Sequence, residues 1–268
     1  ATRHFEVAFN AHGELAKIAA ADGSVSWSKA GKPFFSLGYL RYNDRDVERF
    51  LGEYCRWNDA FRAAWARWDM GKPGLPEGLP SDRSRGEDAE FAVFRRAGAD
   101  IVRARFGVKD DCVRNAGAPA RFEVEYRFPD AEALVEITVQ WFGKSPNRMP
   151  ESIQAAFAPA FGKDAAWRMN KLGSTVDPMA VASGGSRSLH AVNDRDSLIV
   201  RRGKHSLAVD STDAPLLLLG RDTLWRFTDR LPDLDAGFAF CLHNNQWGTN
   251  FPMWYGDDGH FRFRVRLG

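Results

Sequence analysis

The sequence predicts a mainly all-β protein, a large antiparallel β-sandwich with one aromatic-rich helix near residues 46–68. Three observations predict this fold class. Apolar and polar residues alternate in several short segments, as in antiparallel strands with one buried face. Gly, Pro, Asn and Asp punctuate the gaps between these segments. Aromatic residues make up 13% of the chain, and an aromatic excess favours β structure.

The alternating segments run from one end of the chain to the other. In residues 260–266 (HFRFRVR), Phe261, Phe263 and Val265 share one face and three arginines share the other. Residues 121–128 (RFEVEYRF) alternate in the same way. Both are predicted to be half-buried antiparallel strands. The other predicted strands are His4–Asn10, Phe34–Tyr42, Glu90–Arg95, Ile101–Val108, Leu134–Phe142, Ile153–Phe157 and Ser197–Arg202.

One segment departs from the alternation. Between Asp46 and Trp68 apolar residues recur at a helical period and form an unusually aromatic face, which we expect to pack on a sheet or another domain. Asn43 or Asp44 supplies the N-cap. A long loop rich in Gly, Pro and charge follows at residues 71–87. We therefore predict a single sandwich domain over residues 1–268, with a helical and loop excursion at about 43–88.

Composition excludes several kinds of partner. The 37 basic and 35 acidic residues give a net charge of +2 and do not cluster by sign, so we expect no nucleic acid and no membrane partner. No apolar stretch reaches the roughly 18 residues of a membrane helix. Three widely spaced cysteines exclude a disulfide framework, and Cys55 and Cys241 are expected to be small buried residues. Residues 1–20 show no signal-peptide pattern, and the compartment stays open.

The familiar catalytic and metal-binding motifs are missing. The six histidines form no H-x-H, H-x-D or H-E-x-x-H pattern, and no C-x-x-C is present. There is also no G-x-S-x-G elbow and no P-loop. We therefore expect no metal and no cofactor in this chain. A pair of carboxylates for glycoside hydrolysis stays open, because spacing in a β protein does not show which acids face each other.

The segment from Leu242 to Tyr255 (LHNNQWGTNFPMWY) is the most informative stretch for function. Its aromatic rings and side-chain amides suit a carbohydrate, because rings stack on C–H faces and amides bind hydroxyl groups. The same residues also suit a plug at the end of a large sandwich, which is the interpretation that composition favours.

Three charged residues stand at other candidate positions. Arg148 and Glu151 flank a rigid proline in the sequence NRMPE. They form either a charged pair aimed at a ligand or a buried structural ion pair at a corner of the sandwich, and we favour the second. Asp213 precedes an apolar run and either binds local backbone, which we favour, or faces a site.

A set of motifs, taken in order, resembles a known family over nearly the whole chain. They are FNAHGELAKI (9–18), WDMGKPG (68–74), NRMPE (147–151), DP (177–178), GGSRSLHAV (184–192), STDAPL (211–216) and HNNQWGTNFPMW (243–254). The chain resembles the C-terminal β-supersandwich region of proteins related to glycoside hydrolase family 38, the α-mannosidase-like enzymes. More narrowly, it is similar to a domain of unknown function attached to such barrels. The resemblance implies a galactose-mutarotase-like supersandwich.

In that family an N-terminal barrel carries the metal, the nucleophilic Asp and the acid. The H-x-D metal motif of the barrel has no counterpart here, so any divalent metal belongs to a barrel outside this chain. The resemblance implies that the chain is a fragment of a larger enzyme, that it packs on the N-terminal barrel of the same polypeptide, and that it helps to line a sugar site. The nominated carbohydrate-binding residues are Arg148, Glu151, His190, Asp213, His243, Asn245, Trp247, Asn250 and Trp254.

Three functions remain open at this stage. The first is the accessory region of a carbohydrate-active enzyme. The second is a stand-alone carbohydrate-binding module, which the aromatic and amide residues motivate. The third is a self-contained polysaccharide lyase or glycosidase, for which Tyr255, His243, Arg148 and Glu151 are the candidates. Within the 242–255 segment, Trp247 and Phe251 are expected in the core.

Overall fold

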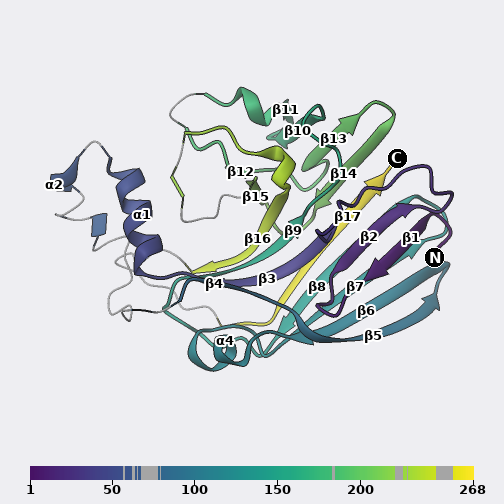
Figure 1. The fold of residues 1–268 in the computed structure, drawn as a ribbon, viewed down its shortest axis with the longest axis horizontal. Helices are drawn as coiled ribbons and strands as arrows, with labels where there is room; N and C mark the ends of the chain where they lie inside the picture. Colours follow the sequence, from purple (N-terminus) through teal and green to yellow (C-terminus); the bar gives the residue numbers. More distant parts are fainter. Residues whose placement is uncertain are drawn as a thin grey trace.

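The computed structural model describes residues 1–56, 58–61, 64, 66–67, 78, 80–182, 185–220, 226–227, 229–245 and 256–268. Across these residues the regular structure is mostly β-strand, arranged in two antiparallel sheets that pack as a sandwich (Figure 1). The predicted fold class is confirmed.

The first sheet has eight strands within the described part of the chain, and distant segments meet in it. β4 (Asp82–Arg85) pairs with β3 beside the main path. The main path, in spatial order, is β1 (Phe5–Phe9), β2 (Leu15–Ala20), β3 (Phe35–Arg41), β9 (Glu151–Phe157), β16 (Phe238–Asn245), β15 (Leu216–Leu219) and β12 (Leu189–Ala191).

The second sheet has nine strands in the described residues. In spatial order they are β11 (Ser174–Val176), β10 (Ala166–Lys171), β13 (Leu198–Arg202), β14 (His205–Ser211), β17 (Gly259–Leu267), β8 (Leu134–Phe142), β7 (Arg121–Pro129), β6 (Ala99–Gly107) and β5 (Glu87–Arg96). The predicted alternation of β17 is confirmed, because Phe263 and Val265 are buried while Arg262 and Arg264 are exposed and pair with carboxylates.

The core lies between the inner faces of the two sheets and is rich in aromatic rings. Phe157 of β9 stacks on Phe238 of β16, with ring centroids 4.9 Å apart. It also meets Phe263 of the opposite sheet edge-on at 6.0 Å. Burying one such ring contributes roughly 1.5–3 kcal/mol, and offset or edge-on ring contacts add to this. The aromatic excess of the sequence is therefore used largely to fill a thick sandwich.

The helical segment begins as the sequence predicts but is interrupted after Tyr54. α1 (Asp44–Tyr54) starts at Asn43, which forms a capping box with Asp46. Its apolar face packs on Leu40 and Tyr42, so it covers the end of β3 (Figure 1). Within the predicted helix near 46–68, α1 ends at Tyr54, and helical structure resumes at α2 (Asp59–Phe61) and is present again at the described residues 64, 66 and 67. Residues 57, 62, 63, 65 and 68 lie outside the described part of the chain. Asn58 stands directly before α2 and is of a residue type that favours helix starts.

The remaining described helices are short. α4 (Asp110–Asn115) follows β6, while η2 (Pro178–Ala180) and η3 (Leu234–Ala236) are single 3-10 turns. After the helical and loop segment the chain returns to strand at β4, from residue 82, and at β5, from residue 87. All three cysteines are free and buried, as expected for Cys55 and Cys241.

Candidate functional site

Three of the nominated residues meet at one end of the sandwich, where β9 begins. The register pairs Glu151 with Arg41 at the end of β3 and with Asn245 at the end of β16. His243 reaches the same place because Leu242 is an extra residue between the paired positions Cys241 and His243. Such a β-bulge re-aims the side chains that follow it.

Glu151 is the centre of a buried polar cluster, the Glu151 cluster, formed with Tyr39, Lys144 and His243. The Lys144 ammonium donates to Glu151 Oε1 at 2.5 Å, and the Tyr39 hydroxyl donates to Oε2 at 2.7 Å. His243 Nε2 lies 3.3 Å from Oε1. The side chains of Glu151 and Lys144 are each 1% exposed. Lys144 also donates to the Gly117 carbonyl at 2.9 Å, so the charges are paired and hydrogen-bonded on both sides.

This arrangement is what a buried ion pair requires to be tolerated. Two charges removed from water offset their desolvation cost only when they pair closely and their remaining donors and acceptors are satisfied. Burial, followed by the negative charge of Glu151, raises the pKa of Tyr39, so its hydroxyl stays a proton donor. The favoured interpretation of Glu151 as a structural ion pair agrees with this geometry. The partner differs, because Lys144 pairs with Glu151 whereas Arg148 is exposed in the preceding loop.

The nearby amides also bind backbone. Asn245 donates from its side chain to the Asn147 carbonyl. The Asn147 side chain donates to the Ala116 carbonyl at 2.7 Å and accepts from the Met149 amide at 3.1 Å. These contacts fix the loop that leads into β9, which is a common role for asparagine in bent backbone.

The other nominated residues lie elsewhere. His190 is buried on β12 at the edge of the first sheet, where burial lowers its pKa and Nε2 lies 3.0 Å from the Arg187 carbonyl. Asp213 accepts from the Arg262 guanidinium at 2.9 Å, and this contact lowers its pKa. Trp247, Asn250 and Trp254 fall outside the described residues, as does Phe251. The sugar-binding role of all nine residues stays a prediction.

Metal and thiol chemistry finds no support in the described part of the chain. No group of three or more His, Cys, Asp or Glu side chains there is placed to hold a metal ion. Burial raises the pKa of the Cys241 thiol to about 12, which disfavours the reactive thiolate. No described helix has the length and apolarity needed to cross a membrane.

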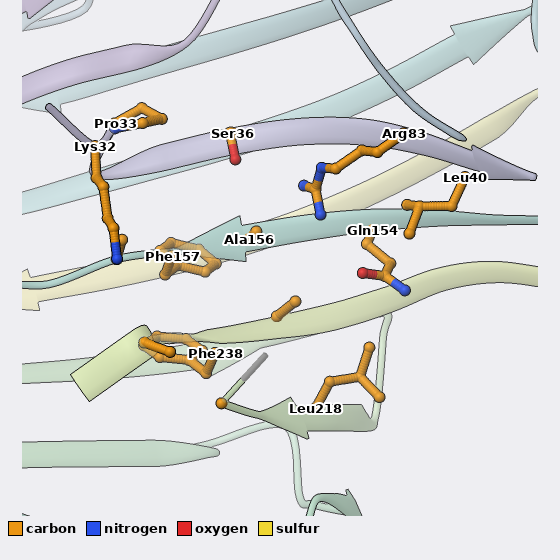
Figure 2. A pocket seen from close by; sticks show the side chains of 14 residues that line it. Lys32, Pro33, Ser36, Leu40, Arg83, Gln154, Ala156, Phe157, Leu218 and Phe238 are labelled. Carbon is orange, nitrogen blue, oxygen red and sulfur yellow. The ribbon is translucent and has the colours of Figure 1, made fainter. Parts of the chain in front are cut away.

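A pocket lies on the opposite, outer face of the same sheet. It has a volume of about 280 Å³, and side chains that project outward from β3, β9, β16 and β15 form its floor (Figure 2). The floor is made mainly of small residues, including Ser36, Ala156 and Ala239. Leu40 and Leu218 add apolar surface at its side. We call this the outer-face pocket.

Two cations reach into the outer-face pocket. Figure 2 shows Lys32 and Arg83 entering from opposite ends of β3, with Ser36 between them. Arg83 lies directly over Gly38, where a Cβ atom would stand 2.7 Å from its Nε atom. The side chain is open to water at the surface, yet the protein around it lowers its pKa by desolvation. Neither cation makes a hydrogen bond or ion pair through its side chain with the described residues.

Gln154 supplies the main neutral polar group of the pocket. It is 4% exposed, and its Nε2 atom donates to Ser152 Oγ at 3.3 Å. The Tyr42 hydroxyl lies 2.9 Å from the same oxygen, which holds this row of polar groups in place. The Gln154 amide oxygen is turned toward the pocket, with no hydrogen-bond partner among the described residues (Figure 2). It is therefore available to a ligand hydroxyl group.

Sequence reasoning missed the outer-face pocket, although a local signal was present. In β3 the small residues Ser36 and Gly38 alternate with Phe35, Leu37 and Tyr39. In β9 a similar alternation sets Gln154 between apolar residues. The pattern indicates an outer face whose side chains are polar or small. It does not show that these two strands are neighbours, nor that β4 places Arg83 beside them.

Several solved structures with the same fold are of carbohydrate-related proteins. A galactose 1-epimerase from Lactobacillus acidophilus NCFM matches with a TM-score of 0.55 and 11% identity over 99% of this chain and 92% of that one. An α-mannosidase from Enterococcus faecalis V583 matches with a TM-score of 0.59 and 7% identity over all of this chain but 29% of that one. A galactose mutarotase-like protein from Clostridium acetobutylicum gives 0.54, 8% identity and coverage of 100% and 94%.

These identities are low, so the likenesses show a shared fold. This chain spans less than a third of the α-mannosidase structure. No curated protein sequence matches the chain. A family model does match residues 1–137, which is more than half of the 268 residues. The chain therefore belongs to the family described as "Domain of unknown function (DUF5054)".

Proposed function

We propose that this chain is a carbohydrate-binding β-sandwich that acts as the accessory region of a carbohydrate-active enzyme. In this proposal it packs on a glycoside hydrolase barrel of the same polypeptide, and the outer-face pocket forms part of the sugar site. The observation that carries the proposal is the pocket, in which Ser36 and Gln154 offer hydrogen bonds above a floor of small residues. The fold shared with a galactose 1-epimerase and an α-mannosidase supports it.

The chemistry of the pocket suits a sugar. Its volume lies near the lower end of ligand pockets, about 300 Å³, which favours one sugar unit over a long chain. Gln154 and Ser36 both offer donor and acceptor groups, as sugar hydroxyls do. Leu40 and Leu218 provide apolar surface for the C–H face of a sugar ring.

The barrel is the part of the proposal that lies outside this chain. Most of the α-mannosidase structure has no counterpart here, since the match covers 29% of it. In our proposal an equivalent barrel carries the catalytic groups and any divalent metal. The sandwich then contributes binding groups and stability.

The Glu151 cluster gives no support to a self-contained lyase or glycosidase. A general acid or base must reach the proton that it transfers. Glu151 and Lys144 are each 1% exposed and neutralise each other inside the sandwich. The Tyr39 pKa is raised, which opposes formation of a tyrosinate base.

A binding experiment tests the pocket. Calorimetric titration of the purified chain with methyl glycosides of mannose, galactose and glucose should show saturable binding, and Gln154→Leu should weaken it at least severalfold. Gln140→Leu is the matched control, because Gln140 is a half-buried glutamine on β8 of the other sheet. Equal binding by the parent and Gln154→Leu, or no binding to any sugar, contradicts the proposal.

An activity experiment tests the accessory role. The chain alone should leave aryl glycosides intact, and the same chain joined to its barrel should hydrolyse one of them. Hydrolysis by the isolated chain would favour the self-contained enzyme. Tight sugar binding that does not change when the barrel is joined would favour the stand-alone module.

A further inference from the structure

We propose that the outer-face pocket binds a monosaccharide that carries an oxyanion, with Arg83 as the residue that pairs with the anionic group. This inference rests on the proposed function and adds a substrate class to it. A carboxylate and a phosphate share the relevant chemistry, since a guanidinium binds both through two parallel hydrogen bonds.

The first support is the charge of the lining. Among the described residues that line the outer-face pocket there are two cations, Lys32 and Arg83, and no carboxylate. Elsewhere most arginines have an acidic partner close by, as Arg85 has in Glu14 and Arg103 in Glu125. Arg83 has no such acidic partner, unlike Arg85 on the same strand. Desolvation lowers the pKa of Arg83 and the Glu14 carboxylate opposes this shift, but Glu14 pairs directly with Arg85. Within the described residues no carboxylate is therefore in direct contact with Arg83.

The second support is the position of Arg83. Its guanidinium packs over Gly38, and a side chain at that position would stand 2.7–2.9 Å from Nε, Cζ and Nη2. Glycine therefore leaves the space in which the guanidinium lies flat over the strand. A planar guanidinium that packs against the strand loses less freedom when it binds a carboxylate or phosphate.

The third support is the spacing of charged and neutral groups. Ser36 lies two residues from Gly38 on the same face of β3, which places their Cα atoms about 7 Å apart. Gln154 points into the same space from β9 (Figure 2). One sugar ring with a charged substituent is long enough to set its anion on Arg83 and its hydroxyl groups on Ser36 and Gln154. Lys32, at the other end of β3, adds to the positive field.

Lys32 is the weaker of the two cations. Asp235 lies near enough to Lys32, Lys29 and Lys163 for all three to lower its pKa, but Lys29 makes the direct ion pair at 2.7 Å. The Asp235 carboxylate is therefore already paired with Lys29.

Arg83 makes no salt bridge with the described residues, so its replacement should leave the fold intact.

The test is a titration of the full chain with paired ligands at low salt. Glucuronate and glucose 6-phosphate should each bind at least about tenfold more tightly than glucose, because a charge-assisted hydrogen bond contributes more than a neutral one. The ligand with the lower Kd shows whether the pocket prefers a carboxylate or a phosphate. Inorganic phosphate alone should bind more weakly than glucose 6-phosphate, and equal binding would overturn the sugar part of the proposal.

Variants assign the effect to Arg83. Arg83→Gln should remove the preference for the anionic sugars and leave glucose binding unchanged, while Arg83→Lys should restore part of the preference. Arg201→Gln is the matched control, because Arg201 is an exposed strand arginine on β13 of the other sheet and should change nothing. Equal affinity for glucose and glucuronate, or an equal loss of both in Arg83→Gln, overturns this inference and leaves the sugar pocket standing. Failure of all sugars to bind overturns the proposed function as well.

Discussion

The buried pair of Lys144 and Glu151 gives the sharpest stability prediction. Lys144→Met removes the cation and keeps most of the apolar stem of the side chain. Glu151 then remains as a negative charge that is 1% exposed, with the Tyr39 hydroxyl as its nearest strong donor. The Gly117 carbonyl also loses a hydrogen bond of 2.9 Å.

The expected cost follows from these losses. Breaking a buried ion pair by removing one partner destabilises a protein by about 3–5 kcal/mol, because an uncompensated charge stays behind. For a chain of this size each kcal/mol lowers Tm by about 2–4 °C, so the fall is about 6–20 °C. Thermal melts followed by circular dichroism, together with urea unfolding, measure both quantities.

A double variant separates charge from packing. Lys144→Met/Glu151→Leu removes both charges of the buried Lys144–Glu151 pair and should be more stable than Lys144→Met alone. Arg114→Met is the matched control, since Arg114 pairs with Asp110 on the surface with side chains 70% and 74% exposed, and it should barely change Tm. The reasoning is refuted if Lys144→Met has the same Tm as the control Arg114→Met, or if the double variant is less stable than Lys144→Met.

Three further predictions concern other parts of the fold. Asn43→Ala should lower the free energy of unfolding by about 1 kcal/mol in urea denaturation, because it removes the capping box of α1, and an unchanged midpoint would count against that role. Gly38→Ala should displace Arg83 and reduce the preference for glucuronate severalfold at nearly constant Tm, whereas an unchanged preference would show that the guanidinium does not need its place over the glycine. The Arg262 contact lowers the pKa of Asp213 below 3.8, so the ion pair stabilises the fold fully above that pH and loses its contribution as the pH falls further. The difference in free energy of unfolding between the parent and Asp213→Asn should therefore narrow below about pH 4. A difference that stays constant with pH would contradict this linkage.

Residue patterns within short segments predicted individual strands and the start of α1. The strict alternation in residues 121–128 and 260–266 fixed which residues face the core, and both segments are strands with those residues buried or half-buried. The helical period near residue 46 predicted α1 and its cap. It did not predict the interruption after Tyr54, because apolar spacing alone does not mark where α1 ends.

Long-range pairing is what the sequence did not reveal. Proximity in the chain made Arg148 the expected partner of Glu151. The ion pair is formed by Lys144, which follows the end of β8. The outer-face pocket depends on β3 pairing with both β4 and β9, segments separated by more than 40 and 100 residues respectively. No local period carries that information.

Charged side chains on the two faces of the first sheet differ in whether they are paired. On the inner face Glu151 and Lys144 neutralise each other, so the Glu151 cluster offers no unpaired charge to a ligand. On the outer face Arg83 is held without an acidic partner, and the surrounding protein already lowers its pKa by desolvation. An oxyanion in the pocket would supply the missing partner, so an anionic sugar should stabilise the fold by about 2.7 kcal/mol at a hundred times its Kd. The cation that the fold leaves unmatched is therefore the reason to look for a ligand here and not at Glu151.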